Sequence, residues 1–157
     1  MKTEPATILC AVDFSADAEA ALQWACKQAL KDDAGLVVLH VVHDPASAPG
    51  FYRKTGENTL QPMEDVAKEM FAEFVAVFKT RHPDIWRADR IETRIVSGLP
   101  SGRIVEVAND IEAGQIIVGS SGHTGLPHIL LGSVAQRVAQ IAKVPVTVVK
   151  AAKVDAE

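Results

Sequence analysis

Short apolar runs alternate along this chain with longer segments whose apolar residues recur at helical spacing. Most of the runs are continuous rather than alternating, which is typical of strands buried on both faces of a sheet. The run at residues 91–96 alternates instead, which favours an edge strand with one wetter face. The predicted strands are residues 7–12, 35–42, 91–96, 115–119 and 144–150.

The segments between these runs carry the apolar stripe of amphipathic helices. The first helix, predicted over residues 16–30, follows Ser15, a good N-cap, and begins with Asp17 and Glu19, which favour the positive end of a helix. The Met and Phe residues of the second helix indicate core packing rather than cofactor binding. The apolar positions of the later helices are Met63, Val66, Met70, Phe71, Phe74 and Phe78, then Ile104, Val107, Ala108 and Ile111, and finally Val134, Val138 and Ile141, buried positions in a helix that Ser133 opens.

Strands that alternate with helices predict an α/β fold, a doubly wound parallel sheet with helices on both faces joined by right-handed crossovers. The length of 157 residues and the hydrophobic fraction of 48% fit a single domain, residues 1–157, with its own core. Ligands of such sheets bind outside the carboxyl ends of the strands, where the winding direction reverses. The residues just after each strand are therefore the first place to look for chemistry.

Charge and cysteine content exclude several classes of function. With 16 basic and 20 acidic residues there is no basic surplus to hold a nucleic-acid backbone, so we expect no nucleic-acid binding. Cys10 and Cys26 lack metal-ligand spacing and are interpreted as small buried hydrophobes in a reducing compartment. The apolar stretch near the N-terminus is far too short for a signal sequence or a membrane span, so the expected location is the cytoplasm.

One connection, residues 119–133, is unusually long and rich in glycine. This glycine segment reads GSSGHTGLPHILLGS, whereas the usual strand-to-helix connection has about two to six residues. Glycine lets a ligand approach main-chain N–H groups, and the following helix adds the positive end of its dipole. A phosphate chain suits both features. The segment contains no Lys or Arg, so an anion would depend on main-chain dipoles, hydroxyls, His123 or His128, and a divalent cation.

Two features have a structural interpretation beside the functional one. In the glycine segment, Gly119 could simply end a strand, and Ser133 with Gln136 could form a capping box. Asp13 follows a buried strand, where an unpaired charge is costly. It could accept a hydrogen bond from the turn near Ser15, or hold a ribose hydroxyl or a phosphate-bound Mg²⁺.

The glycine segment also fits a known pattern: Gly, two residues, Gly, nine residues, Gly, then Ser or Thr. The matching positions are Gly119, Gly122, Gly132 and Ser133. At these positions the chain resembles members of the universal stress protein family that bind ATP. Residues 8–25, 39–42, 98–108 and 130–150 also resemble that family's strands and helices, and the resemblance spans nearly the whole chain except residues 45–90.

The resemblance implies a Rossmann-like five-stranded sheet of order 3-2-1-4-5 that binds ATP, with Asp13 facing the glycine segment. By the same resemblance, Ala11 to Asp13 would border the adenosine and the main chain of Val41 would contact adenine. From its position after the first strand, Asp13 is also the candidate ligand of a phosphate-bound Mg²⁺. The segment departs from many relatives at Ser121 and His123, where they carry basic residues, so ADP or AMP could compete. The implied nucleotide-binding residues are Ala11, Val12, Asp13, Val41, Val118, Gly119, Ser121, Gly122, His123, Gly132, Ser133 and Val134.

The family also implies a homodimer formed through the fifth strand at Val146, Val148 and Val149, although a monomer with that edge covered is the alternative.

The favoured function is nucleotide-dependent regulation in a stress response, with no catalytic residues. Nucleotide binding would change a surface that a protein partner or the second subunit recognises. Two alternatives stay open. One is a slow ATPase or phosphotransfer enzyme, for which Asp13, Ser121 and His123 are the candidate groups. The other is a dimeric interaction module that binds no nucleotide.

Overall fold

Strands and helices alternate along the chain as the sequence pattern predicts. The computed structural model describes residues 6–43, 63–121 and 131–151. Every predicted element is present, with ends that differ by a few residues at most. The elements are β1 Ile8–Ala11, α1 Ala16–Asp32, β2 Leu36–Val42, α2 Met63–Arg81, β3 Ile91–Ser97, α3 Pro100–Asp110, β4 Gln115–Gly119, α4 Ser133–Ile141 and β5 Val146–Val149.

The five strands form one parallel sheet of order β3-β2-β1-β4-β5, as predicted. The chain winds from β1 outward to β3 and then returns to β4 on the other side of β1. Ala11 at the end of β1 is in register with Leu39 of β2 and with Val118 of β4. The winding therefore reverses between β1 and β4, and β3 is an edge strand, as its alternating pattern indicates.

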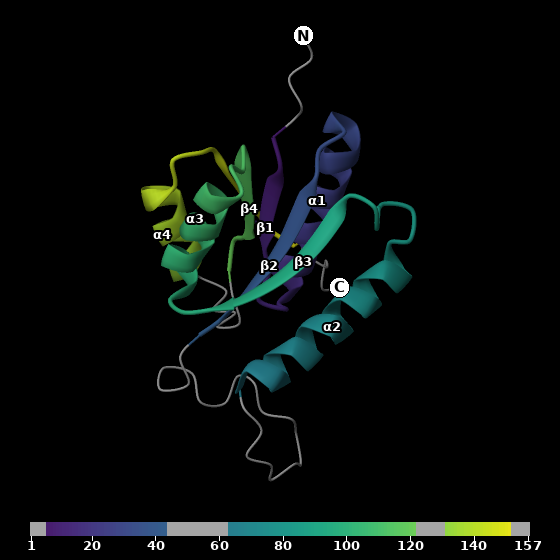
Figure 1. Ribbon diagram of the computed structural model, residues 1–157, viewed down its shortest axis with the longest axis horizontal. Coiled ribbons are helices and arrows are strands. Elements are labelled where there is room, and N and C mark those ends of the chain that lie inside the picture. The colour runs from purple at the N-terminus through teal and green to yellow at the C-terminus, as the bar shows by residue number, and fades with distance from the viewer. Residues whose placement is uncertain (1–5, 44–62, 122–130, 152–157) are drawn as a thin grey trace, which may run out of the picture.

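Helices cover both faces of the sheet, with α1 and α2 on one side and α3 and α4 on the other (Figure 1). Successive residues of β1 point to opposite faces, so Cys10 packs beneath α1 and Leu9 beneath α3. Each face has its own apolar core. Fully buried side chains of the first core include Leu22, Leu36 and Phe78, and those of the second include Leu39, Ile116 and Val138.

Both cysteines are buried free thiols, as the sequence indicates. Burial raises the pKa of the Cys26 thiol to about 12. Burial also raises the pKa of Cys10, and the nearby Cys26 raises it further. Because the thiolate is the reactive form of cysteine, both thiols are inert at neutral pH in the folded chain.

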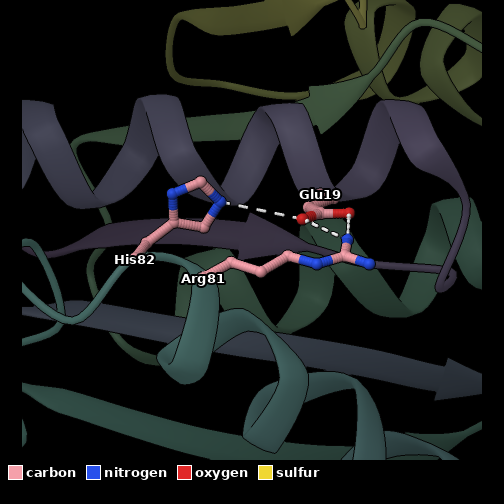
Figure 2. A network of polar contacts seen from close by, with 3 residues as sticks. All are labelled: Glu19, Arg81 and His82. Atoms are coloured by element: carbon pink, nitrogen blue, oxygen red, sulfur yellow. Dashed lines mark hydrogen bonds and ion pairs between the residues drawn. The ribbon is translucent and has the colours of Figure 1, made fainter.

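Helices α1 and α2 are also joined by a polar contact at the surface (Figure 2). One guanidinium nitrogen of Arg81 donates to both carboxylate oxygens of Glu19 at 2.9 Å, and Nε2 of His82 lies 3.7 Å from the same carboxylate. The Arg81 side chain is 59% exposed, so solvent screens the pair and it contributes little stability. Phe78 of α2 and Leu22 of α1 are instead buried in the same apolar core.

The start of α4 differs from the sequence prediction. Ser133 is the first residue of the helix, as predicted, but Gly132 is the N-cap and no side chain caps the helix, so the alternative of a capping box formed by Ser133 and Gln136 is wrong. Val134 is 38% exposed rather than buried, and Ala135 is buried in its place. The reason is that the small Ala135 packs beside Val138 one helical turn away, which rotates the buried stripe by one residue.

Among the described residues, no helix is both long and apolar enough to cross a membrane.

Candidate site at the carboxyl ends of β1 and β4

The carboxyl ends of β1 and β4 lie side by side at the point where the winding reverses. Ala11 and Val118 are register partners there, so the structure brings together two of the predicted site residues. Val12 continues this edge, donating its N–H to the Leu39 carbonyl at 2.8 Å and accepting from Nδ1 of His40 at 2.7 Å. Val41 lies farther along β2. This edge is where a ligand of a doubly wound sheet is expected.

Asp13 begins the turn that leads from β1 into α1. Its Oδ1 accepts hydrogen bonds from the backbone N–H of Ser15 at 3.0 Å and from the Ser15 hydroxyl. The same hydroxyl oxygen accepts from the N–H of Ala18 at 3.1 Å, so Ser15 is the N-cap that the sequence predicts. The local turn bond, one of the two interpretations of Asp13, is therefore present. Its role toward a ligand stays a prediction.

Phe14, which follows Asp13, adopts a left-handed conformation with φ of 68°. Its ring stacks on His40, with the centroids 4.2 Å apart, and also lies near Phe71 and Phe74 of α2. A bulky residue rarely takes this conformation, so the aromatic contacts must offset its cost. The turn that carries Asp13 is thus fixed by packing against α2.

Gly119, the first glycine of the glycine segment, is required by packing. A Cβ at this position would lie 2.9 Å from the backbone carbon of Asp17 and 3.1 Å from the backbone nitrogen of Ala18. Both contacts are with backbone atoms of α1, which cannot move aside as a flexible side chain can. Gly119 therefore allows the first turn of α1 to approach the end of β4.

Asp17 uses this close approach to bind the residues that follow β4. Its Oδ2 accepts from the Ser120 hydroxyl at 2.9 Å, from the Ser121 backbone N–H at 3.0 Å and from the Ser121 hydroxyl. Its Oδ1 accepts from the backbone N–H of Ala151, beyond β5, at 2.7 Å. One carboxylate thus joins the start of α1, the start of the glycine segment and the end of the sheet.

Two opposing effects act on the pKa of Asp17. Partial burial raises it, but the hydrogen bonds from Ser121, Ala151 and Ser120 lower it more, so the pKa lies below its ordinary value. A depressed pKa means that the ionised carboxylate stabilises the fold at neutral pH. This stabilisation is lost as the pH falls below about 3.9 and through the folded-state pKa.

The two ends of the glycine segment meet. The backbone N–H of Gly132 donates to the carbonyl of Ser120, whose own N–H donates to the carbonyl of Val149 at 2.8 Å. The start of α4 is therefore held beside the end of β4. Among the residues that the structure describes, none accepts a hydrogen bond from the backbone N–H of Ser133 or Val134. Gly122, His123 and His128 lie outside the described residues.

Comparison with known proteins identifies the family. A family model described as the universal stress protein family matches residues 6–150. This chain belongs to the universal stress protein family, whose members are stress-response proteins.

The relatives of this universal stress protein include bacterial and archaeal proteins. The chain is 32% identical over 143 residues to a universal stress protein of Mycolicibacterium smegmatis, covering 91% of this chain and 45% of that protein. It is similar in structure to the protein MJ0577 of Methanocaldococcus jannaschii, with a TM-score of 0.69 and 27% identity, covering 97% of this chain and 100% of that chain. The chain spans less than half the length of the mycobacterial relatives that it matches.

A further similar structure is a universal stress protein of Archaeoglobus fulgidus in complex with dAMP. The TM-score is 0.63 at 25% identity, and the match covers 94% of this chain and 100% of that chain. That relative therefore binds an adenine nucleotide on the same fold.

The donor set at this edge bears on the predicted metal. Among the described residues, no group of three or more His, Cys, Asp or Glu side chains could hold a metal ion. Mg²⁺, however, usually takes only one or two carboxylates and completes its shell with substrate phosphates and water. Asp13, in the turn after β1, can supply one such carboxylate, so the described residues fit a metal that arrives with a nucleotide better than a resident metal.

Sequence reasoning missed Asp17 as a member of this site. It interpreted Asp17 only as an acid that favours the helix dipole, because its partners lie 103, 104 and 134 residues away along the chain. A usable signal is present in the sequence, since Ser120 and Ser121 follow a predicted strand that neighbours the start of that helix once the strand order is known.

Proposed function

We propose that this universal stress protein binds ATP with Mg²⁺ at the carboxyl ends of β1 and β4 and acts as a nucleotide-dependent regulatory protein. The observation that carries the proposal is the position of the start of α4. The hydrogen bond from Gly132 to Ser120 holds it at the reversal point, and no described residue accepts from the amides of Ser133 and Val134. A helix N-terminus with free amides favours phosphate.

The site residues then take distinct roles. The N–H groups of Ser121 and Gly132 are already engaged with Asp17 and Ser120, so these two residues shape the site. The amides of Ser133 and Val134 hold phosphate oxygens, and Gly122 and His123 join them as the sequence pattern predicts. The adenosine lies against Ala11, Val12, Val41 and Val118, and beside Asp13 and Gly119.

The glycine segment contains no Lys or Arg, so the phosphate charge is met by main-chain dipoles and by the metal. Asp13 would hold Mg²⁺ together with the phosphates, and the metal supplies the positive charge that the segment lacks. Binding therefore depends strongly on Mg²⁺. The output is conformational, because nucleotide binding favours one arrangement of the glycine segment, which a protein partner reads. ADP and AMP are weaker ligands, since they carry fewer phosphate oxygens for the same amides.

The relative that binds dAMP supports the adenine preference, because its fold matches over nearly the whole chain. Calorimetry with ATP and Mg²⁺ tests the proposal. We expect a dissociation constant of about 1 µM, or roughly −8 kcal/mol. No heat with any adenine nucleotide would contradict it.

Val134→Asp locates the phosphates. An acid in the first turn of a helix is stabilised by the helix dipole, so this variant should be as stable as the parent or up to about 1 kcal/mol more stable. The same charge repels phosphate, so the affinity for ATP should fall by at least about tenfold. Calorimetry and thermal unfolding measure the two effects, which have opposite signs.

Val134→Asn is the matched control for Val134→Asp, because asparagine has nearly the same shape as aspartate but no charge. It should bind ATP within about threefold of the parent, a change of less than 1 kcal/mol. If Val134→Asp binds ATP as tightly as Val134→Asn, the phosphates do not lie at the start of α4.

A further inference from the structure

We infer that Asp17 is a positioning residue of the nucleotide site, which fixes the start of the glycine segment relative to both α1 and the end of β5. The inference rests on the proposed function. It assigns a role in ligand affinity to a side chain that contacts no ligand. Asp17 acts through Ser120 and Ser121, and through Ser120 on Gly132.

The hydrogen bonds of Asp17 come from residues outside its own helix. Asp17 lies in the first turn of α1, yet it does not cap the helix, because Ser15 is the N-cap and accepts from Ala18. Its carboxylate accepts instead from residues that follow β4 and β5. All four hydrogen bonds to this carboxylate come from residues outside α1, so they do not serve to form the helix.

Glu19, in the same turn of α1, binds different partners. Both acids lie in the first turn of α1, and both are stabilised by its dipole. Glu19 is directed to Arg81, the last residue of α2, and to His82, which follows it (Figure 2). Only Asp17 reaches the ends of the strands, and Gly119 provides the room for it.

Consecutive hydrogen bonds connect Asp17 to the start of α4, where the proposed phosphate donors lie. Asp17 binds the Ser120 hydroxyl, the Ser120 carbonyl accepts from Gly132, and Gly132 is the N-cap of α4. The amides of Ser133 and Val134 follow directly. A site that is held in its binding geometry before the ligand arrives avoids paying the entropy of ordering at the moment of binding. Loss of Asp17 should therefore appear as a loss of affinity.

The bond to Ala151 extends the same carboxylate to the segment after β5. The end of β5 is also held by the bond from the Ser120 N–H to the Val149 carbonyl. The glycine segment and the edge strand thus share Asp17 and Ser120 as anchors, so a displacement of one is transmitted to the other.

The test is Asp17→Asn. Asparagine offers one accepting oxygen where aspartate offers two, and its NH₂ group cannot accept from an N–H, so either the Ser121 N–H or the Ala151 N–H loses its acceptor whichever way the amide is turned. We expect the dissociation constant for ATP with Mg²⁺, measured by calorimetry, to rise by about tenfold or more. In the folded variant, hydrogen exchange should accelerate at the Ser121 amide or at the Ala151 amide.

The matched control is Glu19→Gln, which removes an equal charge from the same helical turn. It should bind ATP within about twofold of the parent, because it has the same effect on the dipole and none on the glycine segment. Ser120→Ala is a second, milder variant that removes one donor. Its effect on ATP affinity should disappear in the Asp17→Asn background if Asp17 acts through Ser120.

The outcomes separate the two proposals. If the parent binds no adenine nucleotide, the proposed function fails and this inference fails with it. If the parent binds ATP and Asp17→Asn binds within twofold, the proposed function stands and the positioning role is overturned. If Asp17→Asn does not fold, Ser120→Ala decides: a weaker affinity supports the role, and an unchanged affinity overturns it.

Discussion

At the scale of single residues, the site is organised by contacts that a local pattern does not reveal. Gly119 and Asp17 illustrate this, since each is explained by the other: the missing Cβ of Gly119 admits the backbone of Asp17, whose carboxylate then binds the residues after Gly119. The first glycine of the family pattern thus has a packing role in addition to any role toward the nucleotide.

Gly119→Ala tests this packing role. The new Cβ would press on backbone atoms of α1, so the free energy of unfolding should fall by about 1–3 kcal/mol. The control is Gly102→Ala in α3, where a Cβ meets no atom within 4 Å. Alanine favours a helix there, so Gly102→Ala should stabilise the protein by roughly 0.5–1 kcal/mol. Chemical denaturation measures both, and equal effects of the two substitutions would contradict the packing role.

At the scale of elements, the two edge strands of the sheet differ in charge. On β3, Arg94 donates two hydrogen bonds to Glu92, a charged pair that discourages pairing with another sheet. The sequence of β5 is Val-Thr-Val-Val and carries no charge. β5 is an edge strand in the described part of the chain, and its residues are only partly buried. We propose that β5 pairs with β5 of a second copy, which would cover this edge.

Sedimentation of the purified protein tests the pairing. We expect twice the mass of the chain at micromolar concentration. Thr147→Lys, on β5, should shift the protein to a monomer, because a lysine on an edge opposes pairing. Thr93→Lys makes the same substitution on β3 and should leave the dimer intact. A parent protein that sediments as a monomer, or a dimer that only Thr93→Lys disrupts, would contradict the proposal.

Sequence periodicity predicts the elements well, because burial in a parallel sheet leaves continuous apolar runs such as residues 115–119. It fails at the start of α4, since either Val134 or Ala135 could complete the apolar stripe and only tertiary packing decides between them. It fails for Asp17 for a related reason. The residues that Asp17 binds are brought close by the strand order, which residue spacing alone does not determine.

At the scale of the whole molecule, the fold places the carboxyl end of β1, the end of β4 and the start of α4 at one edge of the sheet. Asp13 and Asp17 lie on either side of the turn into α1, and they have different tasks in this account. We propose that Asp13 faces the metal and the nucleotide, whereas Asp17 fixes Ser120 and Ser121 at the start of the glycine segment.

A crystal structure of the protein grown with ATP and Mg²⁺ would show whether the nucleotide binds at this edge. We expect a nucleotide across the ends of β1 and β4, with phosphate oxygens within hydrogen-bonding distance of the Ser133 and Val134 amides and with Asp17 still bound to Ser120 and Ser121. An empty edge at saturating ATP, or a nucleotide bound elsewhere on the chain, would contradict it.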